Sequence, residues 1–134
     1  HYSFMGHIQD PLISDLINKS APKVINELKD QKVDIAILVP ALGLCNQKVG
    51  LLQRIIEKEG ISTMGISIIR EISESVMLPK TYFINYPFGH AVGESFNRNQ
   101  QKKILYDCLK IIESSEKLGI IVDSPYRWEI DTFD

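Results

Sequence analysis

Short apolar runs alternate with segments of helical period along this chain, and this alternation constrains the fold more than any other feature. The run Val33 to Val39 is almost unbroken, which is typical of a strand covered on both faces, and Pro40 ends it. Three later runs predict further strands, over Ile61 to Ile69, Lys80 to Tyr86 and Gly119 to Val122.

The segments between these runs carry apolar stripes at helical spacing. Ser20 is predicted to cap the first helix, with Pro22 in its first turn, where the missing N–H is tolerated. The predicted helices cover Ser20 to Asp30, Asn46 to Glu59 and Arg98 to Ser115, with a short helical or irregular link over Glu71 to Met77 and a loop over Pro87 to Asn97.

Strands that alternate with helices predict an α/β fold: a three-layer, doubly wound, flavodoxin- or Rossmann-like domain with a mostly parallel sheet of about four strands and right-handed crossovers. The 134 residues fit a single domain over 1–134. The expected strand order is two-one-three. In that order the first strand is central, and the loops that carry Cys45 and His90 face each other across one crevice.

Composition excludes several function classes. The 15 basic and 17 acidic residues give a net charge of -2 and no cationic patch for nucleic acid. No apolar stretch approaches the roughly 18 residues that span a bilayer, so we expect no membrane attachment and a cytoplasmic location. The two cysteines form no CxxC pair and no zinc-type cluster, so we expect neither a metal site nor a disulfide.

Cys45 is the main candidate for chemistry because it follows the first predicted strand where a helix begins. Parallel sheets present reactive groups at the carboxyl ends of their strands, and a helix amino terminus favours a thiolate. The alternative is a small buried hydrophobic residue. Cys108 lies on the apolar stripe of its helix, which indicates core packing.

Two polar residues of the later loop are candidates for the same site. His90 lies between Gly89 and Gly93, where its imidazole could accept the thiol proton or orient a substrate, or could be an ordinary surface side chain. Glu94 could bind a substrate ammonium group, hold His90, or only cap the following helix.

Three further positions have weaker claims to the site. Gly50 could contact a substrate through its N–H, although a structural purpose in letting the helix approach the sheet is the simpler interpretation. Arg70 ends the second strand at the same sheet edge and is a substrate-binding candidate. Arg54, on the polar helix face, suits a salt bridge or an oligomer contact better than a substrate carboxylate.

Two motifs carry a resemblance to a known family. The stretch CNQKVGLLQRIIE from Cys45 to Glu57, followed by FGHAVGE from Phe88 to Glu94, resembles the selenoprotein subunit of the glycine, sarcosine, betaine and D-proline reductases. The D-proline branch is the most similar. The resemblance runs from about Tyr2 to Trp128 and includes Ser124 to Trp128 near the end of the chain.

This resemblance implies a cytoplasmic reductase of amino-acid fermentation in which the residue at the position of Cys45 attacks the carbon next to an amine and cleaves the C–N bond. The family usually has selenocysteine there, so Cys45 is either a natural cysteine or a recoded selenocysteine. Its pyruvoyl group belongs to a separate subunit, so the resemblance implies a pyruvoyl-containing partner, a thiol electron donor, and no cofactor in this chain. Association into an oligomer is also expected.

A thiol has an ordinary pKa of about 8.5 and is largely protonated at neutral pH. A thiolate therefore needs more stabilisation from its surroundings than a selenolate does. Residues 46–48 offer no second thiol, unlike many glycine-type members, which argues against an internal disulfide cycle. The sequence leaves two other functions open: a thiol redox or ligand-sensing protein, and a non-catalytic structural subunit with a buried Cys45.

Overall fold

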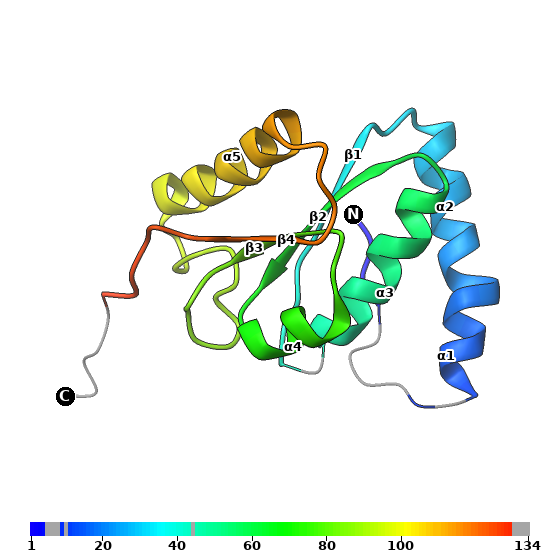
Figure 1. Cartoon of the computed structure of the whole chain (residues 1–134), viewed down its shortest axis with the longest axis horizontal. Helices are drawn as coiled ribbons and strands as arrows, with labels where there is room; N and C mark the ends of the chain where they lie inside the picture. The colour runs from blue at the N-terminus through cyan, green and yellow to red at the C-terminus, as the bar shows by residue number, and fades with distance from the viewer. Residues whose placement is uncertain (5–8, 10, 44, 130–134) are drawn as a thin grey trace.

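The computed structural model describes residues 1–4, 9, 11–43 and 45–129, and these include one four-stranded sheet (Figure 1). Every strand is parallel to its neighbours, and the strand order is β1-β2-β3-β4. The strands are β1 (Ile35–Leu38), β2 (Ser62–Ser67), β3 (Lys80–Phe83) and β4 (Ile120–Asp123). All four therefore coincide with the predicted runs, and their ends differ by a few residues.

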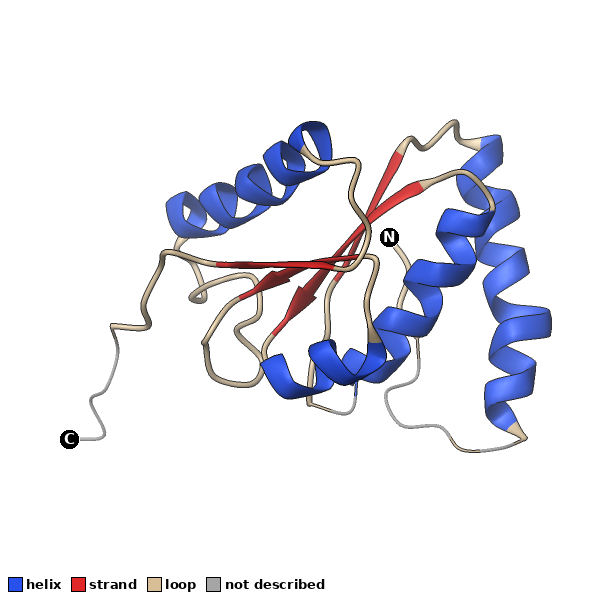
Figure 2. Ribbon diagram, in the orientation of Figure 1, coloured by secondary structure: helices blue, strands red, loops and turns tan. Residues whose placement is uncertain are grey.

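Helices precede the sheet and connect its strands, as Figure 2 shows. They are α1 (Leu12–Asp15), the π-helical η1 (Leu16–Ser20), α2 (Ala21–Asp30), α3 (Cys45–Lys58), α4 (Arg70–Val76) and α5 (Arg98–Ser114). The bounds of α2 agree with the predicted helix, but the predicted cap at Ser20 is wrong. This residue has helical backbone angles and its side chain makes no capping hydrogen bond, because α1 and η1 lead directly into α2.

The predicted order two-one-three is also wrong, because β2 rather than β1 lies in the interior of the sheet. As an edge strand, β1 is only half-buried along its length, and Val39 just beyond it is 46% exposed. The apolar run correctly marked a strand. It did not encode which strands lie beside it, because that choice depends on where the connecting helices pack.

The helices form two layers, one on each face of the sheet. Figures 1 and 2 show α2, α3 and α4 on one face and α5 on the other. This arrangement confirms the predicted three-layer, flavodoxin- or Rossmann-like α/β fold. Because the order is sequential and all strands are parallel, the crossover through α5 has the opposite hand to those through α3 and α4, so the expectation that all crossovers are right-handed is wrong.

Alternation along β2 assigns its residues to the two faces. Met64 and Ile66 are fully buried in the cluster that contains Ile104 and Cys108 of α5. The intervening Gly65 faces α3, where an added Cβ would overlap the side chain of Gln53. A second apolar cluster joins α2 and α3 through Ile25, Leu52 and Ile56. No helix in the described part of the chain is long and apolar enough to cross a membrane.

Candidate functional site

Cys45 is the first residue of α3 and lies just beyond the carboxyl end of β1. Its thiol is free and half-buried, and its backbone N–H donates a hydrogen bond to the carbonyl of Leu42 at 3.0 Å. The sulfur therefore lies at the amino end of a 14-residue helix, where the helix dipole favours a negative charge.

Lys48 lies one turn after Cys45 and is also half-buried. Burial lowers the pKa of the Lys48 ammonium group, and the negative charge that Cys45 can carry opposes this effect, so the two groups interact electrostatically. A cation at this position stabilises a thiolate. Sequence reasoning missed Lys48 because it examined residues 46–48 only for a second thiol. The signal was present in the spacing, since residues three apart share a helix face.

The loops before α3 and after β3 are in contact. The N–H of Gly89 donates to the carbonyl of Ala41 at 3.2 Å, and a Cβ on Gly43 would lie 3.7 Å from Cζ of Phe88. The predicted meeting of the Cys45 and His90 loops is therefore confirmed, although it does not arise from the predicted order in which the first strand is central. Both loops reach across the end of β2, where Ile69 lies beneath Gly43.

His90 is half-buried in this second loop and packs against the C-terminal segment. Its ring centroid lies 4.7 Å from that of Trp128, which also makes an edge contact at 5.0 Å with Tyr86. Its carbonyl accepts a hydrogen bond from the N–H of Gly93 at 2.9 Å. Within the described ranges no hydrogen bond joins the His90 ring to the Cys45 thiol. The structure thus brings their loops together without pairing the side chains.

Glu94 supports the start of α5. Its carboxylate accepts a hydrogen bond from the Asn97 amide at 3.1 Å, and Asn97 in turn caps α5 by accepting from the N–H of Gln100 at 3.1 Å. The N–H of Glu94 donates to the side-chain oxygen of Gln100 at 2.6 Å. Asn97 rather than Glu94 is therefore the capping residue, and Glu94 supports the cap indirectly. Among the residues that the structure describes, Glu94 makes no hydrogen bond to His90.

Gly50 lies where α3 contacts the end of α4. It is buried, and an added Cβ would overlap Leu78 and come within 3.3 Å of Val76. Gly50 therefore has a structural purpose, but it allows α3 to approach the end of α4 rather than the sheet. Arg54 donates to the carbonyls of Val76 and Met77 and so satisfies the end of α4, and it forms no salt bridge with another described residue.

Arg70 lies at the carboxyl edge of the sheet, as predicted, but two carboxylates already contact it. It forms ion pairs with Asp123, at the end of β4, and with Glu74 at 2.9 Å. Its guanidinium carbon lies 5.5 Å from the ring centroid of Phe83. Arg70 therefore ties β4 to α4 across the end of β3. A substrate carboxylate would have to compete with these contacts.

Asn46 is a second residue that sequence reasoning passed over. Its side chain is only 1% exposed, and its amide group donates to the carbonyl of Gly43 at 2.8 Å, which holds the turn before Cys45. Cys108, in contrast, is fully buried, and burial, reinforced by the charge of Asp107, raises the pKa of its thiol to about 12. The predicted core role of Cys108 is confirmed.

The arrangement can support thiolate chemistry at Cys45, with Lys48 as the nearby cation and the His90 loop beside it. Within the described ranges no group of three or more His, Cys, Asp and Glu side chains could hold a metal ion.

The chain is similar in sequence to a curated reductase subunit. The chain is 30% identical over 110 residues to D-proline reductase subunit gamma of Acetoanaerobium sticklandii, an alignment that covers 82% of this chain and 46% of that protein. The chain therefore spans about half the length of the curated relative that it matches. No family model and no solved structure matches it. The similarity supports a relation between this chain and the D-proline reductase subunit gamma family.

Proposed function

We propose that this chain is part of a reductase subunit that cleaves the C–N bond of D-proline, or of a related small amine or amino acid, with Cys45 as the nucleophile. The observation that carries the proposal is the half-buried thiol at the start of α3, one helical turn from Lys48. The similarity to a D-proline reductase subunit supplies the reaction class.

Once the amine has been activated, the Cys45 thiolate attacks the carbon next to the substrate nitrogen. A C–S bond forms as the C–N bond breaks, and the nitrogen takes the electron pair and a proton. A thiol electron donor then attacks the sulfur of Cys45 and leaves a disulfide, while the released carbon takes the electron pair and a proton. A second donor thiol reduces that disulfide and restores Cys45. With D-proline the product is 5-aminopentanoate.

Several residues of this chain have specific roles in the proposed reaction. Lys48 stabilises the thiolate through its charge, and Asn46 holds the turn that presents Cys45. His90, on the adjoining loop, accepts the thiol proton or orients the substrate. Glu94, Gly50 and Arg70 are proposed as residues that build the substrate-binding edge. Their contacts support an indirect role, through the start of α5, the α3–α4 contact and the end of β4.

The amine needs activation before the C–N bond can break. We place the pyruvoyl group that supplies it on a partner subunit and assign no cofactor to this chain. A thiol redox protein that works without this partner is the competing proposal, because a half-buried thiol beside a cation also suits disulfide or peroxide chemistry. A structural subunit with an inert Cys45 receives less support, since the thiol is not fully buried.

The test is turnover of D-proline by the chain co-produced with a pyruvoyl-containing partner subunit, with a dithiol as electron donor. Mass spectrometry of 5-aminopentanoate is the readout. Cys45→Ser should lower the rate by at least about 100-fold because it removes the nucleophile. Cys108→Ala is the matched cysteine control, and it should keep the activity at temperatures where it remains folded.

Full activity of Cys45→Ser would contradict the nucleophile assignment. Peroxide or disulfide reduction at Cys45 without any D-proline turnover would favour the competing thiol redox proposal.

A further inference from the structure

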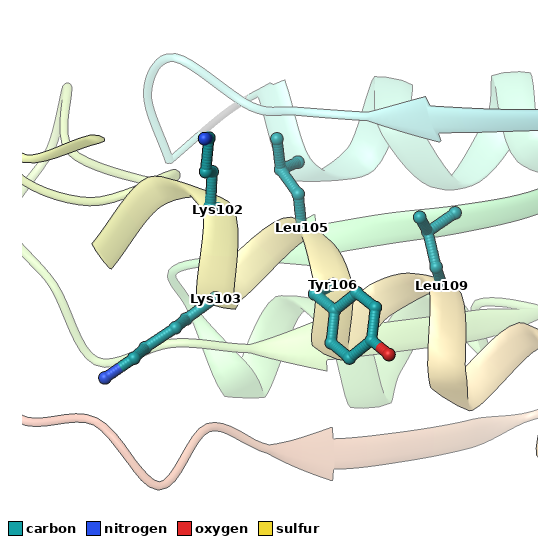
Figure 3. Close-up of a pocket in the computed structure, with 5 residues that line it drawn as sticks. All are labelled: Lys102, Lys103, Leu105, Tyr106 and Leu109. Carbon is teal, nitrogen blue, oxygen red and sulfur yellow. The ribbon is translucent and has the colours of Figure 1, made fainter. Parts of the chain in front are cut away.

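One side of α5 is left uncovered by the rest of the described chain. Leu105 and Leu109 are each 38% exposed and Tyr106 is 59% exposed, although all three belong to the helix that covers one face of the sheet. Figure 3 shows these side chains standing out from α5, with Lys102 and Lys103 beside them along a shallow groove. Apolar side chains grouped in this way often mark an interaction surface.

A stripe of four residues forms the centre of this side. Lys102, Tyr106, Leu109 and Glu113 follow one another at intervals of four, three and four, which places them on one helix face opposite the buried Ile104 and Cys108. We call these four residues the outer stripe. It has a cation at its amino end, an anion at its carboxyl end and two large side chains, Tyr106 and Leu109, between them. The ammonium group of Lys110 lies 4.8 Å from the centroid of the Tyr106 ring and borders the stripe. Neither Lys102 nor Glu113 forms a salt bridge with another described residue.

The order of charges on the outer stripe is unfavourable for an isolated helix. The helix dipole favours anions near the amino end and cations near the carboxyl end, but α5 has no acidic residue in its first turn and no basic residue in its last. Lys102 lies toward the amino end, and Glu113 lies in the last turn. Opposite charges on a partner would compensate the charges of Lys102 and Glu113.

An antiparallel copy of the same helix supplies that compensation. When the outer stripe is reversed end to end, Lys102 lies opposite Glu113 and Tyr106 lies opposite Leu109, so the surface is complementary to itself. A two-fold symmetric interface requires this self-complementarity. The two helix dipoles also run in opposite directions, which is favourable for side-by-side helices.

The geometry points to a second copy of this chain as the occupant, bound through antiparallel packing of α5 on α5 about a two-fold axis between Tyr106 and Leu109. The helix has 17 residues and is about 25 Å long. A single pair of such helices buries an area at the low end of specific interfaces. The dimer is therefore expected to be concentration-dependent. This inference is independent of the chemistry proposed for Cys45.

The test is sedimentation equilibrium of the chain and of charge-swap variants. The concentrations run from about 5 to 500 µM, because a weak interface of this kind dissociates in that range. Lys102→Glu places two glutamates opposite each other at both ends of the interface, and Glu113→Lys does the same with lysines. Each single variant should weaken dimerisation at least about 10-fold. The double variant restores opposite charges at both ends, and its affinity should return to within about 3-fold of the original.

Lys23→Glu, an exposed change of the same charge on α2, is the control and should leave dimerisation unchanged. Circular dichroism establishes that each variant is folded. Lys102→Glu and Glu113→Lys should each slightly raise the melting temperature of the monomer, because both charges then suit the helix dipole. A chain that stays monomeric over the whole range overturns the inference, and so does a double variant that dimerises as weakly as the single variants.

Discussion

The two faces of the sheet differ in what they bury. On the α5 face, β2 and β3 present Met64, Ile66 and Tyr82 to Ile104, and this cluster is almost entirely apolar. On the α3 face β2 presents Thr63, Gly65 and Ser67, and β3 presents Thr81 and the half-buried Phe83. The fully buried Gln53 reaches between α3 and the sheet. The α5 face is therefore an almost uniformly apolar core, while the α3 face combines the apolar cluster that joins α2 and α3 with buried amide and hydroxyl groups.

The two cysteines follow this division. Cys108 lies in the apolar cluster, where burial keeps its thiol neutral, and Cys45 lies at the open end of the α3 face beside Lys48. The same side chain is thus a packing group in one region and a candidate nucleophile in the other. The difference comes from the surroundings of each thiol rather than from the residue type.

The largest effect is expected from truncation on the α5 face. Ile104→Ala should lower the free energy of unfolding by about 2–5 kcal/mol, because Ile104 is fully buried and its removal leaves a cavity against Met64 and Tyr82. Urea unfolding measures the change. Leu118→Ala is the control, since Leu118 is 66% exposed and should change stability by less than about 0.5 kcal/mol. Equal losses in the two variants would contradict the assignment of the core to this face.

A smaller effect is expected from the buried amide on the α3 face. The Gln53 amide donates to the Thr63 hydroxyl at 3.1 Å and to the carbonyl of Lys80 at 2.9 Å. Gln53→Leu should lower the free energy of unfolding by about 1–3 kcal/mol, because it leaves the buried carbonyl of Lys80 without this donor. The exposed Gln47→Leu on the same helix serves as control in the same urea titration. A stabilised Gln53→Leu would show that this polar contact is not needed to hold α3 on the sheet.

The free energy of unfolding should also depend on alkaline pH through the buried thiol on the α5 face. The pKa of Cys108 rises from 9.0 to about 12 on folding, so between these values the unfolded chain has released a proton that the folded chain retains. The free energy of unfolding then falls with rising pH, by up to about 1.4 kcal/mol per pH unit from this group. Cys108→Ala should remove that part of the slope, and Leu118→Ala, at an exposed position, should leave it unchanged. Identical slopes for the two variants would contradict the burial of the Cys108 thiol.

The sequence predicted the elements well and their arrangement poorly. All four apolar runs became strands, and the helix that begins near Cys45 and the helix from Arg98 lie within a residue or two of their predicted bounds, because each is encoded by local periodicity. Strand order was mispredicted because β1, β2 and β3 have similar apolar patterns, and nothing in such a pattern specifies a neighbour.

The candidate site was predictable where it depends on topology. Any parallel sheet gathers its carboxyl-end loops, so the Cys45 and His90 loops meet even though the strand order differs. Specific side-chain contacts could not be foreseen. Arg70 pairs with Asp123 across the end of β3, which requires β4 to lie beside β3. Lys48 was foreseeable from its spacing to Cys45.

The most direct test of the central claim is the alkylation rate of Cys45 by iodoacetamide at pH 7, followed by mass spectrometry with Cys108 as the internal control. We predict that Cys45 reacts at least about 10-fold faster than Cys108. Lys48→Met should lower the alkylation rate of Cys45 severalfold, and Lys48→Arg should keep the rate of the original chain. Comparison of the two variants separates activation by the positive charge from the effect of exposure alone. A Cys45 that reacts no faster than Cys108, or at a rate that Lys48→Met leaves unchanged, would contradict the account of Cys45 as a thiolate nucleophile activated by Lys48.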